Sequence, residues 1–222
     1  NDYLGLTRHP AVIAAAHEAL DRWGAGSGSA RLIVGSRPVH HELEAELADW
    51  KAAPRAALFP TGFAANLGVL TAVGTADTII CSDELNHASI IDGCRLARAE
   101  TAIYRHCDLD HLDAILGERG TRRAVVVSDT VFSMDGDCAD VDALVELCGR
   151  HGALLVLDEA HAVLGPQVET GEVPTLRVGT LSKTLGALGG FVAGPTPFIE
   201  LLENAARPYI FTTAPTPADT AA

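Results

Sequence analysis

The sequence predicts an α/β protein whose mainly parallel sheet is covered by helices on both faces. From residue 55 onward, short apolar runs alternate with amphipathic stretches, and this order is typical of strands linked by crossover helices. The composition is 48% hydrophobic and 20% charged, so the chain can bury a sizeable core. There is no internal repeat, and no shift in composition marks a second domain.

The chain begins with two helices that a glycine-rich loop joins. In the first, residues 9–23, Val12, Ala16 and Leu20 recur at helical spacing before Gly24. The loop spans residues 24–35, and the second amphipathic helix spans residues 38–52. Apolar runs predict strands at 56–59, 78–81, 102–104, 124–128, 153–157, 176–180 and 190–193. Periodic stretches predict helices at 63–73, 88–98, 109–118, 141–151 and 196–206. We expect residues 1–54 to form an N-terminal helical part and residues 55–222 a large domain.

Composition excludes several classes of protein. The net charge of −13 argues against nucleic-acid binding, which needs a basic surface. The cysteines are odd in number and have no CxxC spacing, which predicts reduced thiols in a cytosolic protein and no metal site. They are Cys81, Cys94, Cys107, Cys138 and Cys148. No signal peptide or membrane-spanning run is found. The chain starts without Met and stops in mid-pattern, so we expect it to be a piece of a longer protein.

Polar residues just after strands are the candidate site residues, because ligands of such sheets bind beyond the carboxyl ends of the strands. Lys183 follows the strand at 176–180 among Gly, Ser, Thr and Leu residues, and the chain has only one other lysine, Lys51. Burial favours the neutral amine, which is the nucleophile that attacks carbonyl groups. A solvated loop lysine remains the alternative.

Asp158 ends the apolar run Leu154-Leu-Val-Leu-Asp158. A buried carboxylate needs a cation, a metal or a protonated nitrogen, and a protonated pyridine nitrogen meets this need. The alternative, a magnesium-binding acid, requires a GxxxxGK[ST] loop that the chain lacks. His161, three residues later, is placed to bind the same ligand or to position Asp158.

Two further turns are candidates for ligand binding. Thr61, Gly62 and Phe63 lie between a strand and a helix, where free N–H groups favour a phosphate, although such turns are common in α/β proteins. His87 is either a flat platform for a ring or simply a residue that starts a helix. The loop at 24–35 looks like a dinucleotide fingerprint but follows a helix, so we reject NAD binding. We assign the other histidines to the surface or the scaffold: His9, His17, His40, His41, His106, His111 and His151.

Seven motifs in order resemble one family. They are Asn1-Asp-Tyr-Leu-Gly, Gly28-Ser-Ala-Arg-Leu-Ile-Val-Gly35, Gly62-Phe-Ala-Ala-Asn66, Asn86-His-Ala-Ser89, Phe132-Ser-Met-Asp-Gly-Asp137, Asp158-Glu-Ala-His161 and Gly179-Thr-Leu-Ser-Lys-Thr-Leu-Gly186. Together they resemble the α-oxoamine synthases, fold-type I enzymes that depend on pyridoxal 5'-phosphate (PLP). The run Arg207-Pro-Tyr-Ile-Phe-Thr-Thr-Ala-Pro resembles the branch that joins L-alanine to a pimeloyl thioester in biotin biosynthesis.

The resemblance implies a large domain with a seven-stranded sheet, amino-acid and acyl-CoA or acyl-carrier-protein substrates, and a homodimer with shared active sites. It assigns catalysis to Lys183, as Schiff-base lysine and base, and to His87, Asp158 and His161. The implied cofactor-binding residues are Gly62, Phe63, His87, Ser133, Asp158, His161, Thr180, Ser182, Lys183, Thr212 and Thr213. Thr212 or Thr213 would reach the phosphate of the neighbouring subunit. Asn1 would lie at the substrate end of the site.

The sequence departs from the family pattern at three places. The segment 162–173 after Asp158-Glu-Ala-His161 is short, and Asp129 stands where Glu is common. The family's C-terminal small domain, with an arginine that binds the substrate carboxylate, lies beyond this chain. Three other functions stay open: a glycine-using relative (2-amino-3-ketobutyrate CoA ligase or 5-aminolevulinate synthase), a non-catalytic subunit, and a binding module.

Overall fold

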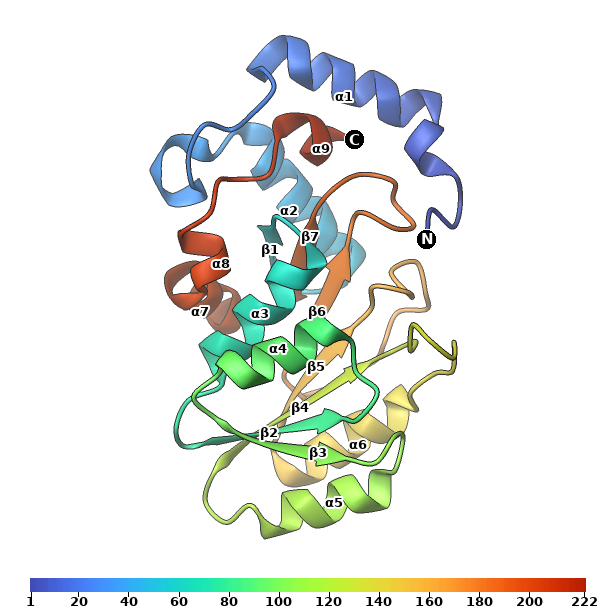
Figure 1. Cartoon of the computed structure of the whole chain (residues 1–222), viewed down its shortest axis with the longest axis vertical. Coiled ribbons are helices and arrows are strands. Elements are labelled where there is room, and N and C mark those ends of the chain that lie inside the picture. The colour runs from blue at the N-terminus through green and yellow to red at the C-terminus, as the bar shows by residue number, and fades with distance from the viewer.

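A seven-stranded sheet forms the centre of the computed structural model, which describes residues 1–222 (Figure 1). The strand order is β1-β7-β6-β5-β4-β2-β3. The bounds are β1 (Arg55–Phe59), β2 (Thr78–Asp83), β3 (Glu100–Tyr104), β4 (Arg123–Asp129), β5 (Leu154–Asp158), β6 (Thr175–Thr180) and β7 (Gly190–Gly194). Only β7 runs antiparallel to its neighbours, β1 and β6. The prediction of a mainly parallel α/β sheet is confirmed.

The helices are η1 (Leu6–Arg8), α1 (Pro10–Trp23), η2 (Arg31–Gly35), α2 (Pro38–Trp50), α3 (Gly62–Val73), α4 (Ala88–Leu96), α5 (Leu109–Glu118), α6 (Val141–His151), α7 (Thr196–Ala205), α8 (Arg207–Ile210) and α9 (Pro217–Ala221). Helices α1 to α7 match the seven predicted stretches, with ends that differ by at most two residues, whereas η1, η2, α8 and α9 are not among the predicted helices. None of the helices combines the length and the apolar character that crossing a membrane requires.

The segment Arg31–Gly35 differs from the prediction, because it forms a π-helical turn where the sequence predicts an irregular loop. The buried Arg31 guanidinium donates to both carboxylate oxygens of Glu44 in α2, each at 2.8 Å. This bidentate ion pair fixes the turn against the second helix, and it depends on a long-range pairing that local sequence does not reveal.

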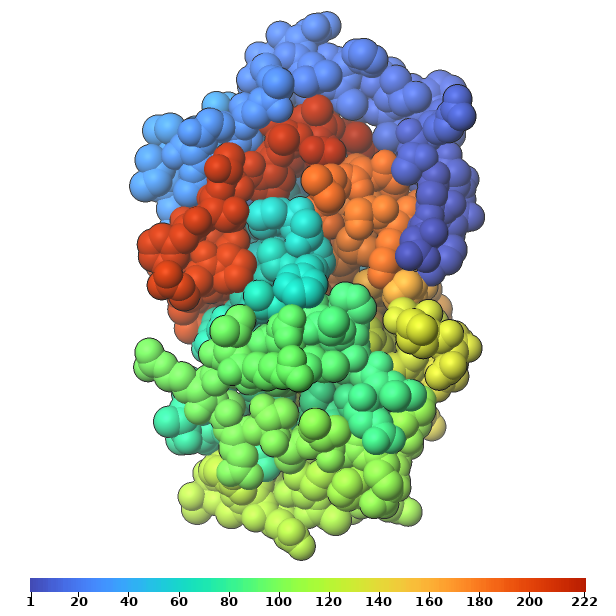
Figure 2. Space-filling model, in the orientation of Figure 1, coloured from blue at the N-terminus to red at the C-terminus, as the bar shows by residue number.

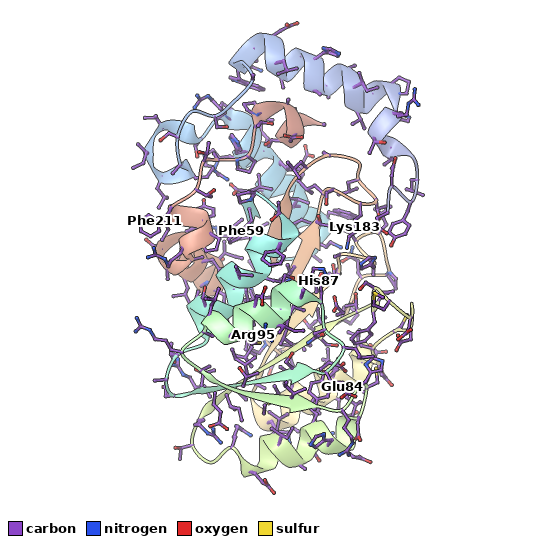
Figure 3. The ribbon with its side chains drawn as sticks, viewed as in Figure 1. Phe59, Glu84, His87, Arg95, Lys183 and Phe211 are labelled. Atoms are coloured by element: carbon purple, nitrogen blue, oxygen red, sulfur yellow. The ribbon has the colours of Figure 1, made fainter.

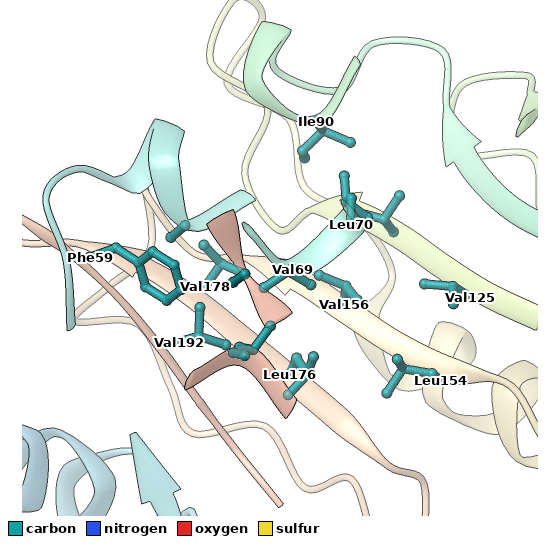
Figure 4. Packing of buried hydrophobic residues seen from close by; sticks show 14 of the residues in the cluster. Phe59, Val69, Leu70, Ile90, Val125, Leu154, Val156, Leu176, Val178 and Val192 are labelled. Atoms are coloured by element: carbon teal, nitrogen blue, oxygen red, sulfur yellow. The ribbon is translucent and has the colours of Figure 1, made fainter. Parts of the chain in front are cut away.

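Alternate residues of the central strands face two apolar layers. Val125 and Val127 point toward α3, α4, α7 and α8, in the layer that Figure 4 shows. Ala124 and Val126 point toward α5 and α6 on the other face. Because successive strand side chains alternate between faces, an unbroken apolar strand is suited to a sheet that is covered on both sides.

A buried charge network joins the residue that follows α2 to the residue that follows β5 and to the middle of β6. The ammonium of Lys51 lies 2.8 Å from a carboxylate oxygen of Glu159, and it donates to the carbonyl of Val163 at 2.6 Å. Arg177 donates from Nε to the other Glu159 oxygen at 2.6 Å. The network therefore holds the segment after Asp158 against the sheet.

Replacing Lys51 by Met is expected to lower the free energy of unfolding by about 3–5 kcal/mol, because it removes one partner of a buried ion pair. Urea denaturation followed by circular dichroism measures the change. The control is Arg55→Gln, which breaks a partly exposed pair with Glu203 and is expected to cost less than about 1 kcal/mol. Equal small losses in both variants would contradict the assigned role of the network.

Candidate active site

Lys183, His161 and Tyr3 form a chain of contacts at the carboxyl ends of β5 and β6. The Lys183 amine lies 2.8 Å from Nε2 of His161, and the Tyr3 hydroxyl lies 2.7 Å from Nδ1 of the same ring. Burial lowers the pKa of Lys183, although Asp158 and Asp129 oppose the shift. Burial, and next the charge of Lys183, lower the pKa of His161. The site therefore favours an uncharged nucleophilic amine.

Asp158 ends β5 and is buried, with 4% of its surface exposed. One carboxylate oxygen accepts from the Asn66 amide at 2.6 Å, and the other accepts from the N–H of Ala160 at 2.8 Å. No cationic side chain forms a salt bridge with it, and the nearby Asn66 Oδ1 is buried without a hydrogen-bond partner. A buried acid without a paired cation fits a ligand that brings a protonated nitrogen.

Asp129 lies beside Asp158 in register on the neighbouring strand. Its carboxylate accepts from the backbone N–H of His87 at 2.7 Å, and its own N–H donates to Asn86 at 2.8 Å. Burial, and next the charge of Asp158, raise the pKa of Asp129 to about 7. Asp129, which stands where Glu is common in the family, is thus in direct contact with the loop that carries His87.

His87 begins α4 and is exposed, and its Nδ1 lies 2.8 Å from the Ser89 hydroxyl. Figure 3 shows His87 at this helix start, with Lys183 across the carboxyl edge of the sheet. Burial is the main cause of the lowered pKa of His161, and the charge of His87 contributes to it, so the two rings lie on the same side of the site. This position is compatible with a platform for a planar ligand.

The turn between β1 and α3 forms a cup with the end of β6. Thr61 caps the helix by accepting from Ala64 N–H at 3.0 Å, which leaves the N–H groups of Gly62 and Phe63 without partners in the helix. A Cβ on Gly62 would lie 3.3 Å from Cβ of Thr180. The Thr180 hydroxyl lies 2.7 Å from that of Ser182. N–H groups at a helix start beside two hydroxyls suit a phosphate.

Gly190 brings β7 against this cup. A Cβ there would lie only 2.4 Å from the carbonyl carbon of Thr61 and 2.5 Å from the nitrogen of Gly62. The position therefore requires glycine, since any side chain would push the helix start outward.

The N-terminal segment closes one side of the site. Figure 2 shows it (dark blue) beside the segment around residues 180–190 (orange), and Leu6 packs against Gly186. The Tyr3 hydroxyl, 2.7 Å from Nδ1 of His161, brings this segment to the ring.

The structure does not bring three predicted residues into this cluster. Ser133 is exposed in the turn between Val131 and Cys138, and no hydrogen bond joins it to Asp158 or His161. Thr212 and Thr213 follow α8, where Ala214 N–H donates to the Ser29 carbonyl. Their assignment to a neighbouring subunit stays a prediction.

Tyr3, Asn66 and Asp129 contact the cluster but are absent from the residues that the sequence predicts. Tyr3 and Asn66 lie inside motifs that the sequence singles out, Asn1-Asp-Tyr-Leu-Gly and Gly62-Phe-Ala-Ala-Asn66. The position of Tyr3 and Asn66 within those motifs was the sequence signal that could have identified them as site residues. Their partners, His161 and Asp158, are 158 and 92 residues away, so the contacts appear only in the fold.

A family model described as aminotransferase class I and II matches residues 1–222. The chain belongs to the aminotransferase class I and II family. It is 51% identical over 232 residues to 8-amino-7-oxononanoate synthase of Anaeromyxobacter sp. (strain K) and covers 58% of that protein. It is 44% identical to the enzyme of the same name from Thermoanaerobacter pseudethanolicus and covers 59% of it. Each alignment includes 100% of this chain.

Solved structures of family members have the same fold. Serine palmitoyltransferase from S. paucimobilis, with a bound PLP–myriocin aldimine, superposes with a TM-score of 0.92 at 36% identity. The match covers 98% of this chain and 57% of that one. 8-Amino-7-oxononanoate synthase from Francisella tularensis gives a TM-score of 0.79 at 26% identity, with 99% and 64% covered. The predicted resemblance to α-oxoamine synthases is confirmed, and the chain spans somewhat over half the length of these relatives.

Replacing Asp129 by Asn is expected to stabilise the protein at pH 8 but not at pH 4. Burial and the charge of Asp158 raise the pKa of Asp129 to about 7 in the folded protein, whereas the ordinary pKa of an exposed aspartate is 3.8. The unfolded chain therefore binds fewer protons between these values, and this group lowers stability as the pH rises through them. The expected gain at pH 8 is at least about 1 kcal/mol.

Denaturant unfolding at both pH values measures the effect, on protein without added ligand. Asp113→Asn is the control, because a hydrogen bond from His151 lowers the pKa of that exposed acid and no gain is expected. A stability difference for Asp129→Asn that does not change with pH would show that the carboxylate is already ionised in the acidic range.

Proposed function

We propose that the protein containing this chain is a PLP-dependent acyltransferase that condenses L-alanine with a pimeloyl thioester to give 8-amino-7-oxononanoate. The thioester carrier is CoA or a carrier protein. The observation that carries the proposal is a half-buried Lys183 in contact with His161, at the same sheet edge as a buried Asp158 without a paired cation, in a chain 51% identical to 8-amino-7-oxononanoate synthase. Neither a non-catalytic subunit nor a binding module would need these three side chains in this arrangement.

The residues of the site fit PLP. Asp158 would face the pyridine nitrogen, and the N–H groups of Gly62 and Phe63, with the hydroxyls of Thr180 and Ser182, would hold the phosphate. We assign His87 to the ring face, Ser133 to its edge, and Lys183 to the covalent attachment. When bound, PLP supplies an electron sink that stabilises a carbanion.

The protein groups supply binding and proton transfer. The lowered pKa of Lys183 favours the uncharged form of its amine, the form that can take the α-proton of the amino acid. His161 lies within hydrogen-bond reach of that amine and is fixed by Tyr3, so it can orient the amine. Asn66 orients Asp158. We place the substrate end of the site at Asn1.

We further propose a homodimer in the cytoplasm. Large apolar side chains are exposed on η2 and just after α8, two segments that pack together: Leu32, Ile33, Val34 and Phe211, with Ile33 73% exposed. An exposed apolar patch next to Thr212 and Thr213 supports a subunit interface that would carry these hydroxyls toward the partner's phosphate site. All five cysteines are free thiols, as suits a reducing compartment.

The function is tested by mixing the full-length protein, loaded with PLP, with pimeloyl-CoA and either L-alanine or glycine, and following released thiol. Thiol release with L-alanine at a higher kcat/KM than with glycine is expected. Lys183→Ala is expected to lower kcat by at least about a hundredfold, because it removes the general base. A preference for glycine would favour the glycine-using alternative, and no turnover with any acyl thioester would favour the non-catalytic subunit.

Gly190→Ala is expected to weaken PLP binding by at least about tenfold, or 1.4 kcal/mol. The added methyl would displace the backbone of Thr61 and Gly62 and so open the phosphate cup. The matched control is Gly117→Ala in α5, where a Cβ meets nothing within 4 Å. PLP titration followed by absorbance, with circular dichroism as a check on folding, measures both. Unchanged affinity in a folded Gly190→Ala variant would place the phosphate elsewhere.

A further inference from the structure

Asp83, His106 and Cys107 form a cluster outside the proposed PLP site. Asp83 is the last residue of β2, and the other two follow β3 (Figure 3, near Glu84, which accepts from the His106 N–H). One carboxylate oxygen, one ring nitrogen and the sulfur all lie within 4.8 Å of one another. Asp83 is buried, whereas Cys107 is exposed, so an ion has a path from solvent.

The distances fit a zinc ion after small movements. The Asp83 oxygen lies 2.9 Å from Nδ1 of His106, and the Cys107 sulfur lies 3.8 Å from the same nitrogen. Tetrahedral zinc, with bonds of about 2.0 Å to nitrogen or oxygen and about 2.3 Å to sulfur, separates its ligand atoms by roughly 3.3–3.6 Å. The ion would enter between the carboxylate and the imidazole and spread them by a few tenths of an ångström.

The imidazole is already oriented for such a role. Nε2 of His106 lies 2.6 Å from a carboxylate oxygen of Asp137, and the ring packs edge-to-face on Phe132 at 4.4 Å. A carboxylate on one ring nitrogen leaves the other nitrogen available, as in carboxylate–histidine–zinc arrangements. Asp137 therefore holds Nδ1 toward Asp83, while the Cys107 sulfur lies beside the ring, 3.8 Å from Nδ1 and 3.7 Å from Nε2.

Cys107 occupies an unusual backbone conformation. Its φ is 54°, in the left-handed region that residues other than glycine, asparagine and aspartate rarely adopt. Its N–H donates to the second Asp83 oxygen at 2.9 Å, which holds the conformation and keeps the sulfur beside the ring. This costly backbone conformation places the Cys107 sulfur beside Asp83 and His106, where a metal ion could bind it.

We propose that Asp83, His106 and Cys107 bind a zinc ion, with the fourth ligand position open to solvent. Carboxylate, imidazole and thiolate together form a ligand set that suits zinc. Through Asp137 the ion would couple the loop after β2, which leads to His87, to the turn that carries Ser133. The sequence predicts no metal because its cysteines have no CxxC spacing, and Asp83 and His106 are 23 residues apart in the chain.

The test is a titration of the purified protein with Co²⁺, in the presence of a phosphine reductant and without chelator. One equivalent is expected to give the intense red-region bands of tetrahedral Co²⁺ together with a thiolate-to-cobalt band in the near ultraviolet. Zn²⁺ is expected to remove both. Only the weak spectrum of octahedral Co²⁺ would overturn the proposal.

Cys107→Asn is the decisive variant, because asparagine tolerates the left-handed backbone and lacks sulfur. It is expected to lose the thiolate band and to bind Co²⁺ at least tenfold more weakly. Cys138→Ser, which removes an exposed thiol next to Asp137, and His17→Ala, which removes an exposed imidazole, are expected to behave like the wild type. A thiolate band that survives Cys107→Asn would overturn the proposal.

A measurement on the wild type avoids any folding defect in the variants. Alkylation of Cys107 and of Cys138 by iodoacetamide is followed by mass spectrometry with and without Zn²⁺. Zinc is expected to slow modification of Cys107 at least tenfold while Cys138 reacts as before. Equal rates for Cys107 with and without zinc would also overturn the proposal.

Discussion

The buried carboxylate of Asp158 is the constraint on which the site depends. It stands at the end of a strand that is apolar on both faces, and its partners inside the protein are an amide and a backbone N–H. Neither supplies the positive charge that a buried carboxylate calls for. Lys183 is near enough for Asp158 to oppose its pKa shift, yet the two form no salt bridge. The fold thus holds acid and amine apart, which leaves the charge of Asp158 for a ligand to balance.

The sheet topology produces this separation. Asp129, Asp158 and Thr180 end three neighbouring parallel strands, β4, β5 and β6, at one edge of the sheet. The crossing to antiparallel β7 then brings Gly190 against the start of α3. The free N–H groups of Gly62 and Phe63 therefore lie at the same edge of the sheet as Asp158. The strands between them set the distance from these N–H groups to the carboxylate.

Most of the fold could be predicted from the sequence because its strands and helices carry clear local signals. Apolar runs such as Leu154-Leu-Val-Leu mark buried strands, and the cap residue Thr61 marks a helix start. The π-helical turn at Arg31–Gly35 was missed, because the Arg31–Glu44 pair that fixes it is a tertiary contact.

The site was predictable to a similar extent. Lys183, Asp158 and His161 follow from residue type and strand ends, and the structure brings them to one edge of the sheet. Tyr3 and Asn66 could not be derived in the same way, since neither follows a strand and each acts through a residue far away in sequence. The position of a hydroxyl or an amide beside a reactive group depends on how distant segments pack, which no local pattern encodes.

The two lysines of the chain show how the fold assigns opposite roles to the same side chain. Burial lowers the pKa of both Lys51 and Lys183. Lys51 meets the carboxylate of Glu159 at 2.8 Å, so its charge is matched and it contributes to structure. Lys183 meets the imidazole of His161, which is itself shifted toward the neutral form. A neutral neighbour does not stabilise an ammonium, so the amine of Lys183 is the one that remains available for covalent chemistry.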